Sequence, residues 1–117
     1  MILVVDDDEM NLRMAEFILK KANYEVLKAD SGQEGLSLAV KGGIELILLD
    51  IEMPGMSGIE TAEALSADER TKSIPVLFLT ASPDENMEAA KRLGVKGCIK
   101  KPFLPPQLLA GIQEILA

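Results

Sequence analysis

Five polar side chains of this sequence are of types that could do chemistry together: Asp6, Asp7, Asp50, Thr80 and Lys101. Three carboxylates can share one small cleft only if a positive charge balances them, and a hard divalent cation is the natural one. Mg²⁺ takes one or two carboxylates, keeps several waters and accepts phosphate oxygens as further ligands. A lysine and a hydroxyl beside the cation would stabilise such a phosphoryl group. The residue types therefore fit an aspartate that accepts phosphate.

Asp50 directly follows the apolar run 46–49, and a turn-forming Met-Pro-Gly-Met-Ser-Gly sequence begins three residues after it. A run that is apolar on both faces indicates a strand buried on both sides, as in a parallel sheet. Open α/β sheets bind their ligands at the carboxyl ends of the strands, where Asp50 would lie. A carboxylate is costly to bury there without a cationic partner, so we expect the other polar residues to supply one.

Apolar segments of strand length alternate with segments of helical periodicity along the whole chain. We expect strands at residues 2–5, 24–29, 44–49, 75–80 and 95–100, and helices at 10–22, 31–40, 57–65, 82–93 and 105–116. Ser31, Ser57 and Ser82 each precede a glutamate by three positions, the pattern of a capping box at a helix start. This alternation predicts an α/β fold, with a parallel sheet covered by helices on both faces. The carboxyl ends of all strands would then meet at one edge, where the five polar residues converge.

Composition excludes several classes of function. With 117 residues the chain is expected to form one domain, and it contains no apolar run long enough to span a membrane. The net charge of −7 argues against binding to nucleic acid, and the absence of histidine excludes histidine-based catalysis and histidine metal ligands. A single cysteine and no signal peptide are typical of a protein of the reducing cytoplasm.

Four motifs, in order along the chain, resemble those of the receiver domain of two-component response regulators, the chemotaxis-regulator type of fold. They are Val4-Val5-Asp6-Asp7, Leu49-Asp50 with Met53-Pro54-Gly55-Met56-Ser57-Gly58, Leu79-Thr80-Ala81, and Lys101-Pro102-Phe103. Any one of them is a weak signal, but the four together are highly specific and cover essentially the whole chain. The resemblance implies a single receiver domain over residues 1–117, doubly wound and flavodoxin-like, with strand order 2-1-3-4-5 in three α/β/α layers.

The resemblance also assigns the site residues. Asp50 would attack the phosphorus of a phosphohistidine on a sensor histidine kinase or phosphotransfer protein. Asp7, Asp50 and the backbone carbonyl of Glu52 would ligate Mg²⁺ directly, Asp6 would act through a metal-bound water, and Mn²⁺ could substitute. Lys101 would pair with the phosphoryl oxygens, and Thr80 would move to hydrogen-bond them.

Signalling would follow from this change at one edge of the sheet. Members of the family bind an output domain or target protein through the fourth helix, fifth strand and fifth helix. Such a domain is a switch and not an enzyme, apart from catalysing its own phosphorylation and dephosphorylation. The resemblance further implies a cis peptide bond between Lys101 and Pro102, which only an X-Pro bond adopts at low cost.

One position departs from the commonest family pattern. Cys98 stands three residues before Lys101, where the family usually carries a tyrosine or phenylalanine that moves with the threonine. A thiol cannot report loop closure by burying a ring, so we expect the transmitted change to be weaker or routed elsewhere. Glu52 and Ser82 occupy positions that flank the phosphoryl group in the family and tune its hydrolysis, in a direction that the sequence leaves open.

Two alternative functions share parts of this residue pattern. A phosphorylation-independent adaptor would be expected to lack an acid, the threonine or the lysine, and all are present. A phosphatase that forms an aspartyl phosphate would carry its nucleophile on the first strand within an Asp-x-Asp pair, whereas here the acids after the first strand are adjacent. The last helix is unusually apolar, which fits either a fully used core face or a surface for a homodimer or output partner.

Overall fold

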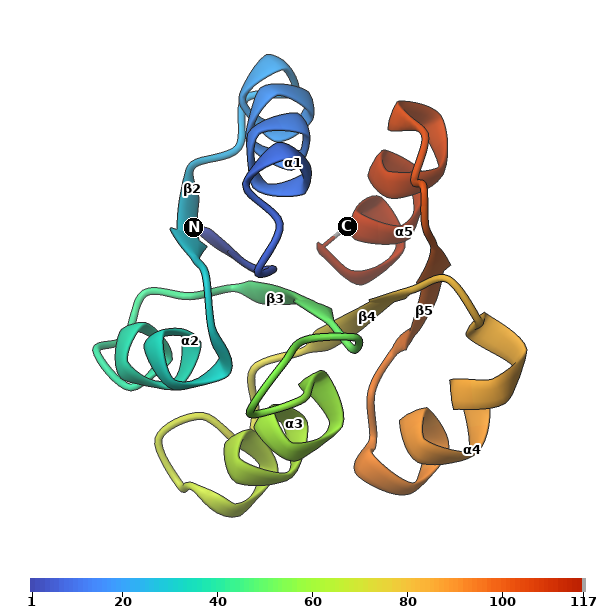
Figure 1. Cartoon of the computed structure of the whole chain (residues 1–117). Helices are drawn as coiled ribbons and strands as arrows, with labels where there is room; N and C mark the ends of the chain where they lie inside the picture. Colours follow the sequence, from blue (N-terminus) through green and yellow to red (C-terminus); the bar gives the residue numbers. More distant parts are fainter. Residues whose placement is uncertain (117) are drawn as a thin grey trace.

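The apolar segments form one parallel sheet of five strands in the order β2-β1-β3-β4-β5 (Figure 1). The computed structural model describes residues 1–116. The strands are β1 (Ile2–Val5), β2 (Val26–Ala29), β3 (Leu46–Asp50), β4 (Val76–Thr80) and β5 (Gly97–Lys100). The helices are α1 (Glu9–Lys21), α2 (Gly32–Ala39), α3 (Gly58–Ala67), α4 (Pro83–Leu93) and α5 (Pro105–Leu116). The predicted doubly wound, flavodoxin-like topology is confirmed.

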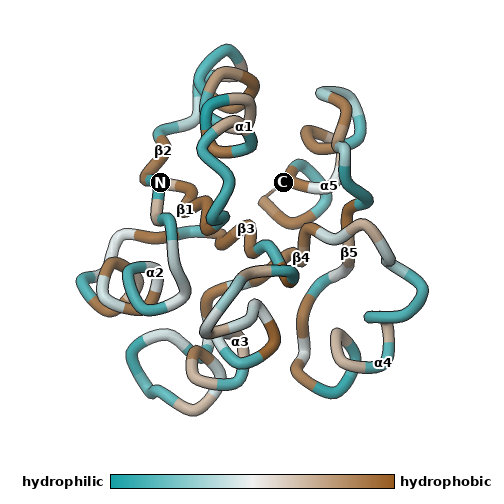
Figure 2. The backbone as a smooth tube through the Cα atoms, viewed as in Figure 1, coloured by the Kyte–Doolittle hydropathy of each residue, from teal (hydrophilic) through white to brown (hydrophobic). Residues whose placement is uncertain are grey.

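Helices cover both faces of the sheet and give the three layers of the fold (Figure 1). Alternate strand residues point to opposite faces. Ile2 and Val4 of β1 therefore pack with residues of α1 and α5, whereas Leu3 and Val5 pack on the side of α2, α3 and α4. The tube in Figure 2 shows the strands as mostly apolar segments and the helices as segments in which polar and apolar residues alternate. Every residue of β1, β3 and β4 is buried, and these segments are apolar except for Asp50 and Thr80 at the ends of β3 and β4.

Four strands begin later than the apolar pattern indicated. β2, β3 and β5 start two residues after the predicted positions, and β4 starts one residue after its predicted position. The preceding residues run alongside the sheet and make single backbone bonds, as the amide of Glu45 does to the Met1 carbonyl and that of Lys96 to the Val76 carbonyl. Side-chain type does not separate such lead-in residues from residues of the ladder itself. None of the helices within residues 1–116 is long and apolar enough to cross a lipid bilayer.

The three predicted capping boxes differ in the structure. Ser57 forms a complete one with Glu60 at the start of α3. Ser31 accepts from the amide of Glu34, but the Glu34 carboxylate accepts from Asp30 instead of Ser31. The prediction for Ser82 is wrong, because its side chain makes no capping bond and α4 begins on Pro83.

The turn after β3 depends on the absence of a side chain at Gly58. The amide of Gly58 donates to the carbonyl of Ile51 at 3.0 Å, so α3 begins directly against the end of β3. A Cβ at Gly58 would collide with the backbone carbonyl of Asp50 and with the Cα of Ile51. Gly58 thereby lets the loop of residues 51–57 fold tightly beside Asp50.

We expect Gly58→Ala to lower the free energy of unfolding by more than about 2 kcal/mol, since the new methyl group meets backbone that can only shift as a whole. Urea denaturation of the purified variant measures this. Gly97→Ala is the matched control, because a Cβ there meets only the Leu77 side chain at an ordinary 3.7 Å. A Gly58→Ala variant as stable as Gly97→Ala would contradict this account of the loop.

Candidate functional site

Three acidic side chains converge at the carboxyl ends of β1 and β3. Asp6 and Asp7 follow β1, Asp50 is the last residue of β3, and the two strands are neighbours in the sheet. One carboxylate oxygen from each residue lies within 4.8 Å of the other two. The structure therefore brings together the three acids that the sequence placed at this edge.

The unpaired oxygens of this cluster fit a cation. Asp6 and Asp50 are buried, whereas Asp7 is exposed. Within residues 1–116, the Oδ2 atoms of Asp6 and Asp50 are buried without a hydrogen-bond partner. Buried polar atoms normally have partners, because leaving them unpaired costs about 1–3 kcal/mol. Carboxylate oxygens gathered in this way are the ligands that Mg²⁺ and Mn²⁺ prefer, so the donor set suits the expected metal.

Lys101 supplies the positive charge that faces Asp50. Its Nζ lies 2.6 Å from Oδ1 of Asp50, and its amide donates to the Thr80 carbonyl at 2.8 Å, which ties the turn after β5 to the end of β4. The Lys101-Pro102 peptide bond is cis, as predicted. Phe103, just beyond it, is buried in the core against α1 and α5.

Burial and charge shift the pKa values of this pair. Burial raises the pKa of Asp50 to about 7; the hydrogen bond from Lys101 opposes this rise, and the Asp6 carboxylate adds to it. For Lys101, burial alone would lower the pKa, but the hydrogen bond to Asp50 and the charges of Asp50, Asp6 and Glu52 raise it. Lys101 is therefore cationic at neutral pH, and it holds a carboxylate that would otherwise be strongly disfavoured in a buried site.

Thr80 is fully buried at the end of β4, with its hydroxyl turned to Glu52. Oγ1 donates to Oε2 of Glu52 at 2.8 Å, and the amide of Ala81 donates to Oε1 of the same carboxylate at 3.1 Å. The amide of Glu52 donates in turn to Oδ1 of Asp50 at 3.2 Å. The metal-binding role of the Glu52 carbonyl stays a prediction, and the clamp made by its side chain is a feature that the sequence did not reveal.

Asn86 is a further residue of the site that sequence patterns missed. It lies in the first turns of α4, and its Nδ2 donates to Thr80 Oγ1 at 3.1 Å and to the Ser82 carbonyl at 3.0 Å. The amide of Ser82 also donates to Thr80 Oγ1, at 3.0 Å. A hydrophilic asparagine six residues after a strand-end threonine has no motif to mark it.

Cys98, which stands where the family pattern usually has an aromatic residue, is half-buried. It packs at the edge of the core cluster beneath α2, α3 and α4, and burial raises the pKa of its thiol. A neutral, packed thiol acts as a small apolar side chain.

The apolar character of α5 is largely explained by the core. Leu108 and Ile112 are fully buried, and Leu109, Ile115 and Leu116 are partly buried against the same cluster. Leu104, just before the helix, is 57% exposed. Beside α5, α1 carries three exposed apolar side chains: Met10, Met14 and Phe17.

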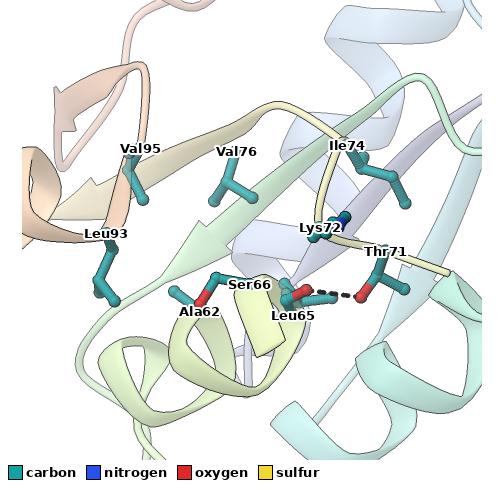
Figure 3. A pocket seen from close by; sticks show the side chains of 10 residues that line it. Ala62, Leu65, Ser66, Thr71, Lys72, Ile74, Val76, Leu93 and Val95 are labelled. Atoms are coloured by element: carbon teal, nitrogen blue, oxygen red, sulfur yellow. Dashed lines mark hydrogen bonds between the residues drawn. The ribbon is translucent and has the colours of Figure 1, made fainter. Parts of the chain in front are cut away.

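A small cavity of about 40 Å³ lies at the opposite ends of the strands (Figure 3). Its lining includes Ile74 and Val95, which precede β4 and β5, together with Ala62, Leu65 and Leu93 from the covering helices. A hydrogen bond of 2.7 Å from Thr71 Oγ1 to the Leu65 carbonyl closes one side of it. The cavity therefore takes no part in the acidic site.

Comparisons with known proteins agree with this geometry. The family model described as response regulator receiver domain matches residues 2–113. The chain is 40% identical to the phosphate regulon transcriptional regulatory protein PhoB of Pseudomonas aeruginosa, aligned over 98% of this chain and 51% of that protein. It is 34% identical to protein PilH of the same organism, over 99% of this chain and 97% of PilH. The chain thus spans about half the length of the first relative and nearly all of the second.

Solved structures show the same fold. The chemotaxis protein CheY4 of Vibrio cholerae superposes with a TM-score of 0.92 at 35% identity, covering 98% of this chain and 97% of that one. A CheY-like receiver domain protein from Methanospirillum hungatei superposes with a TM-score of 0.88 at 32% identity, covering 97% and 90%.

We expect Mg²⁺ to stabilise the protein, because binding at the acidic cluster occurs only in the folded chain. At a Mg²⁺ concentration one hundred times the dissociation constant, the free energy of unfolding should rise by about 2.7 kcal/mol. Urea denaturation with and without Mg²⁺ measures the gain. Asp7→Ala should lose most of it, whereas Asp84→Ala, an exposed acid on α4, should keep it. Equal gains in the two variants would place the cation elsewhere.

Stability without metal should depend on the protonation of Asp50. Its pKa of about 7 in the folded protein exceeds the ordinary value of 3.8, so the folded state binds the proton more tightly. The free energy of unfolding should therefore fall as pH rises from about 4 to about 7, by up to about 4 kcal/mol from this group. Denaturation in EDTA at pH 5 and pH 8 should show a smaller loss for Asp50→Asn than for the wild type. Equal losses would mean that Asp50 is ionised across this range.

Proposed function

The chain belongs to the response regulator receiver domains of two-component signalling, and from this premise we propose that it acts over residues 1–117 as one phosphoacceptor switch. Asp50 accepts a phosphoryl group from a phosphohistidine, and the modified edge of the sheet alters the binding of partner proteins. The observation that carries this proposal is the convergence of buried Asp50 with Lys101 and the two acids after β1.

The transfer begins with an oxygen of Asp50 as nucleophile. It forms a bond to phosphorus as the bond from phosphorus to the donor's imidazole nitrogen breaks, and the imidazole leaves with the electron pair of that bond. Lys101 and the amide of Glu52 both hold Oδ1 of Asp50, so Oδ2, which is unpaired within residues 1–116, is the oxygen left to attack. The Asp50 side chain is thereby oriented before the donor arrives.

Charge balance decides whether the incoming phosphoryl group is tolerated among three acids. Mg²⁺ or Mn²⁺, held by Asp7, Asp50 and the Glu52 carbonyl with Asp6 acting through water, would neutralise charge on the phosphoryl oxygens. Lys101, already beside Asp50, supplies a second positive charge at the same point. Thr80 offers its hydroxyl from the neighbouring strand end, since Asp50 and Leu79 are register partners.

Receiver domains interact with histidine kinases and with output or target proteins. For this chain we assign the output contact to the face of α4, β5 and α5, because Lys101 and Thr80 join the acidic edge to these elements.

The exposed Met10, Met14 and Phe17 lie on α1, which begins just after the acidic loop. They suit contact with the phosphodonor, whose histidine must approach that edge. We assign a homodimer contact to the apolar α5, with the exposed Leu104 just before it. Because the chain has a net charge of −7, we propose that it binds neither nucleic acid nor membrane. Its single cysteine fits a cytoplasmic location, which we also propose.

Two other functions fit less well. An adaptor independent of phosphorylation would not need a buried acid with a lysine 2.6 Å away. A phosphatase that forms an aspartyl phosphate would carry its nucleophile after the first strand, and here Asp50 ends β3. We therefore propose that the chain catalyses only its own phosphorylation and dephosphorylation.

Incubation with acetyl phosphate and Mg²⁺, followed by measurement of intact mass, tests the proposal. We expect one added phosphoryl group in the wild type, none in Asp50→Ala and none in EDTA. Glu69→Ala, which removes an exposed acid in the loop after α3, serves as the control that keeps the adduct.

Rapid hydrolysis could hide the adduct, so binding of beryllofluoride with Mg²⁺ is measured in parallel. A protein that forms neither the adduct nor the beryllofluoride complex would be a phosphorylation-independent adaptor, and the proposal would be wrong.

A further inference from the structure

The hydroxyl of Thr80 has no hydrogen-bonding capacity to spare. A hydroxyl has one proton to donate and two lone pairs that accept. Thr80 donates to Glu52, and it accepts from the amide of Ser82 and from Nδ2 of Asn86. A new hydrogen bond from Thr80 to any other acceptor therefore requires that the bond to Glu52 be given up.

Glu52 holds the two donors at the end of β4 as a pair. Its Oε2 accepts from Thr80 and its Oε1 from the amide of Ala81. Both donors lie beside Asp50, because the Glu52 amide is bonded to Oδ1 of Asp50 and Thr80 ends the neighbouring strand. A phosphoryl group on Asp50 offers anionic oxygens to these donors in place of the Glu52 carboxylate. The two anions thus compete for the same hydroxyl and amide.

Asn86 connects the same hydroxyl to the start of α4. Ser82 precedes this helix but makes no side-chain capping bond, so the usual way of holding a helix start is missing. Asn86 instead bridges the Ser82 carbonyl and Thr80 Oγ1, and the Ser82 amide rests on the same oxygen. The first turn of α4 is therefore anchored to the position of Thr80 Oγ1.

β5 carries no aromatic side chain that could move together with Thr80 and transmit that movement to α4. The residue at that place is Cys98, which is packed and too small to fill and vacate a pocket as a ring would. Hydrogen bonds from Thr80 to the start of α4 can transmit the movement of Thr80 that the Cys98 side chain cannot.

We propose that Glu52 and Asn86 are positioning residues that hold Thr80 in a latch between the phosphoacceptor edge and α4. Phosphorylation of Asp50 takes the Thr80 hydroxyl and the Ala81 amide from Glu52, and the displacement of Thr80 Oγ1 releases Asn86 and the first turn of α4. This inference rests on the proposed phosphoacceptor function and names the residues that regulate it.

The test records backbone amide chemical shifts with and without Mg²⁺ and beryllofluoride, with α2 as an internal reference. Without ligand, Glu52→Ala should move the amide signals of residues 81–86 toward their positions in the wild-type complex. The same variant should bind beryllofluoride about tenfold more tightly, because the competing charged hydrogen bonds are gone. Glu114→Ala, which removes an exposed acid of α5 far along the chain from residues 81–86, should do neither.

Asn86→Ala tests the second half of the latch. It should bind beryllofluoride within about threefold of the wild type, yet the shift changes of α4 on binding should fall by at least half. Asn11→Ala, an asparagine of α1 without a side-chain bond to Thr80, should respond as the wild type does.

Three outcomes contradict the latch. If α4 responds fully in Asn86→Ala, the signal does not pass through that side chain, although phosphoacceptance stands. If Glu52→Ala leaves residues 81–86 unmoved in the free protein, Glu52 acts by charge alone and not by holding Thr80. If the wild type forms no beryllofluoride complex and no acetyl phosphate adduct, the proposed function fails and the latch fails with it.

Discussion

The burial of the Asp50 carboxylate is the constraint on which the rest of the site depends. A carboxylate with 1% exposure, close to two further acids, would be neutralised by protonation if nothing else compensated it. Lys101 compensates one oxygen, and the Glu52 amide adds a hydrogen bond to it. The other oxygen is left without a partner within residues 1–116, as the nucleophilic role that we propose for it requires.

This constraint explains why the flanking segments are shaped as they are. The turn at Lys101 is tied to Thr80, and Phe103 is anchored in the core, so the lysine cannot drift away from its acid. On the other side, Gly58 lets α3 start against the backbone of Asp50. The anchored turn at Lys101 and the close start of α3 at Gly58 are thus the two backbone features that surround the buried Asp50 carboxylate.

The same constraint connects the site to the surface. The amide of Glu52 donates to the Asp50 carboxylate, and the carboxylate of Glu52 accepts from Thr80 and Ala81 at the end of β4. One residue therefore links the two strand ends. Thr80 passes this link to the start of α4 through Ser82 and Asn86. In a chain where Cys98 takes the place of an aromatic ring, hydrogen bonds of defined geometry are a physically sufficient substitute, because breaking one leaves a buried polar group to be satisfied anew.

The sequence by itself determined the alternation of strands and helices, the buried strand before Asp50 and the edge at which the polar residues meet. Parallel strands place all their carboxyl ends together, so residues far apart in the chain could be assigned to one site without coordinates. Only the tertiary structure decided which atoms pair there. The Glu52 carboxylate and Thr80 are 28 positions apart, and the start of α4 has no side-chain cap from Ser82 but has bonds from the Ser82 amide and Asn86 to Thr80. Such choices depend on side-chain rotamers and on competition among neighbours brought close by folding, neither of which a spacing along the chain records.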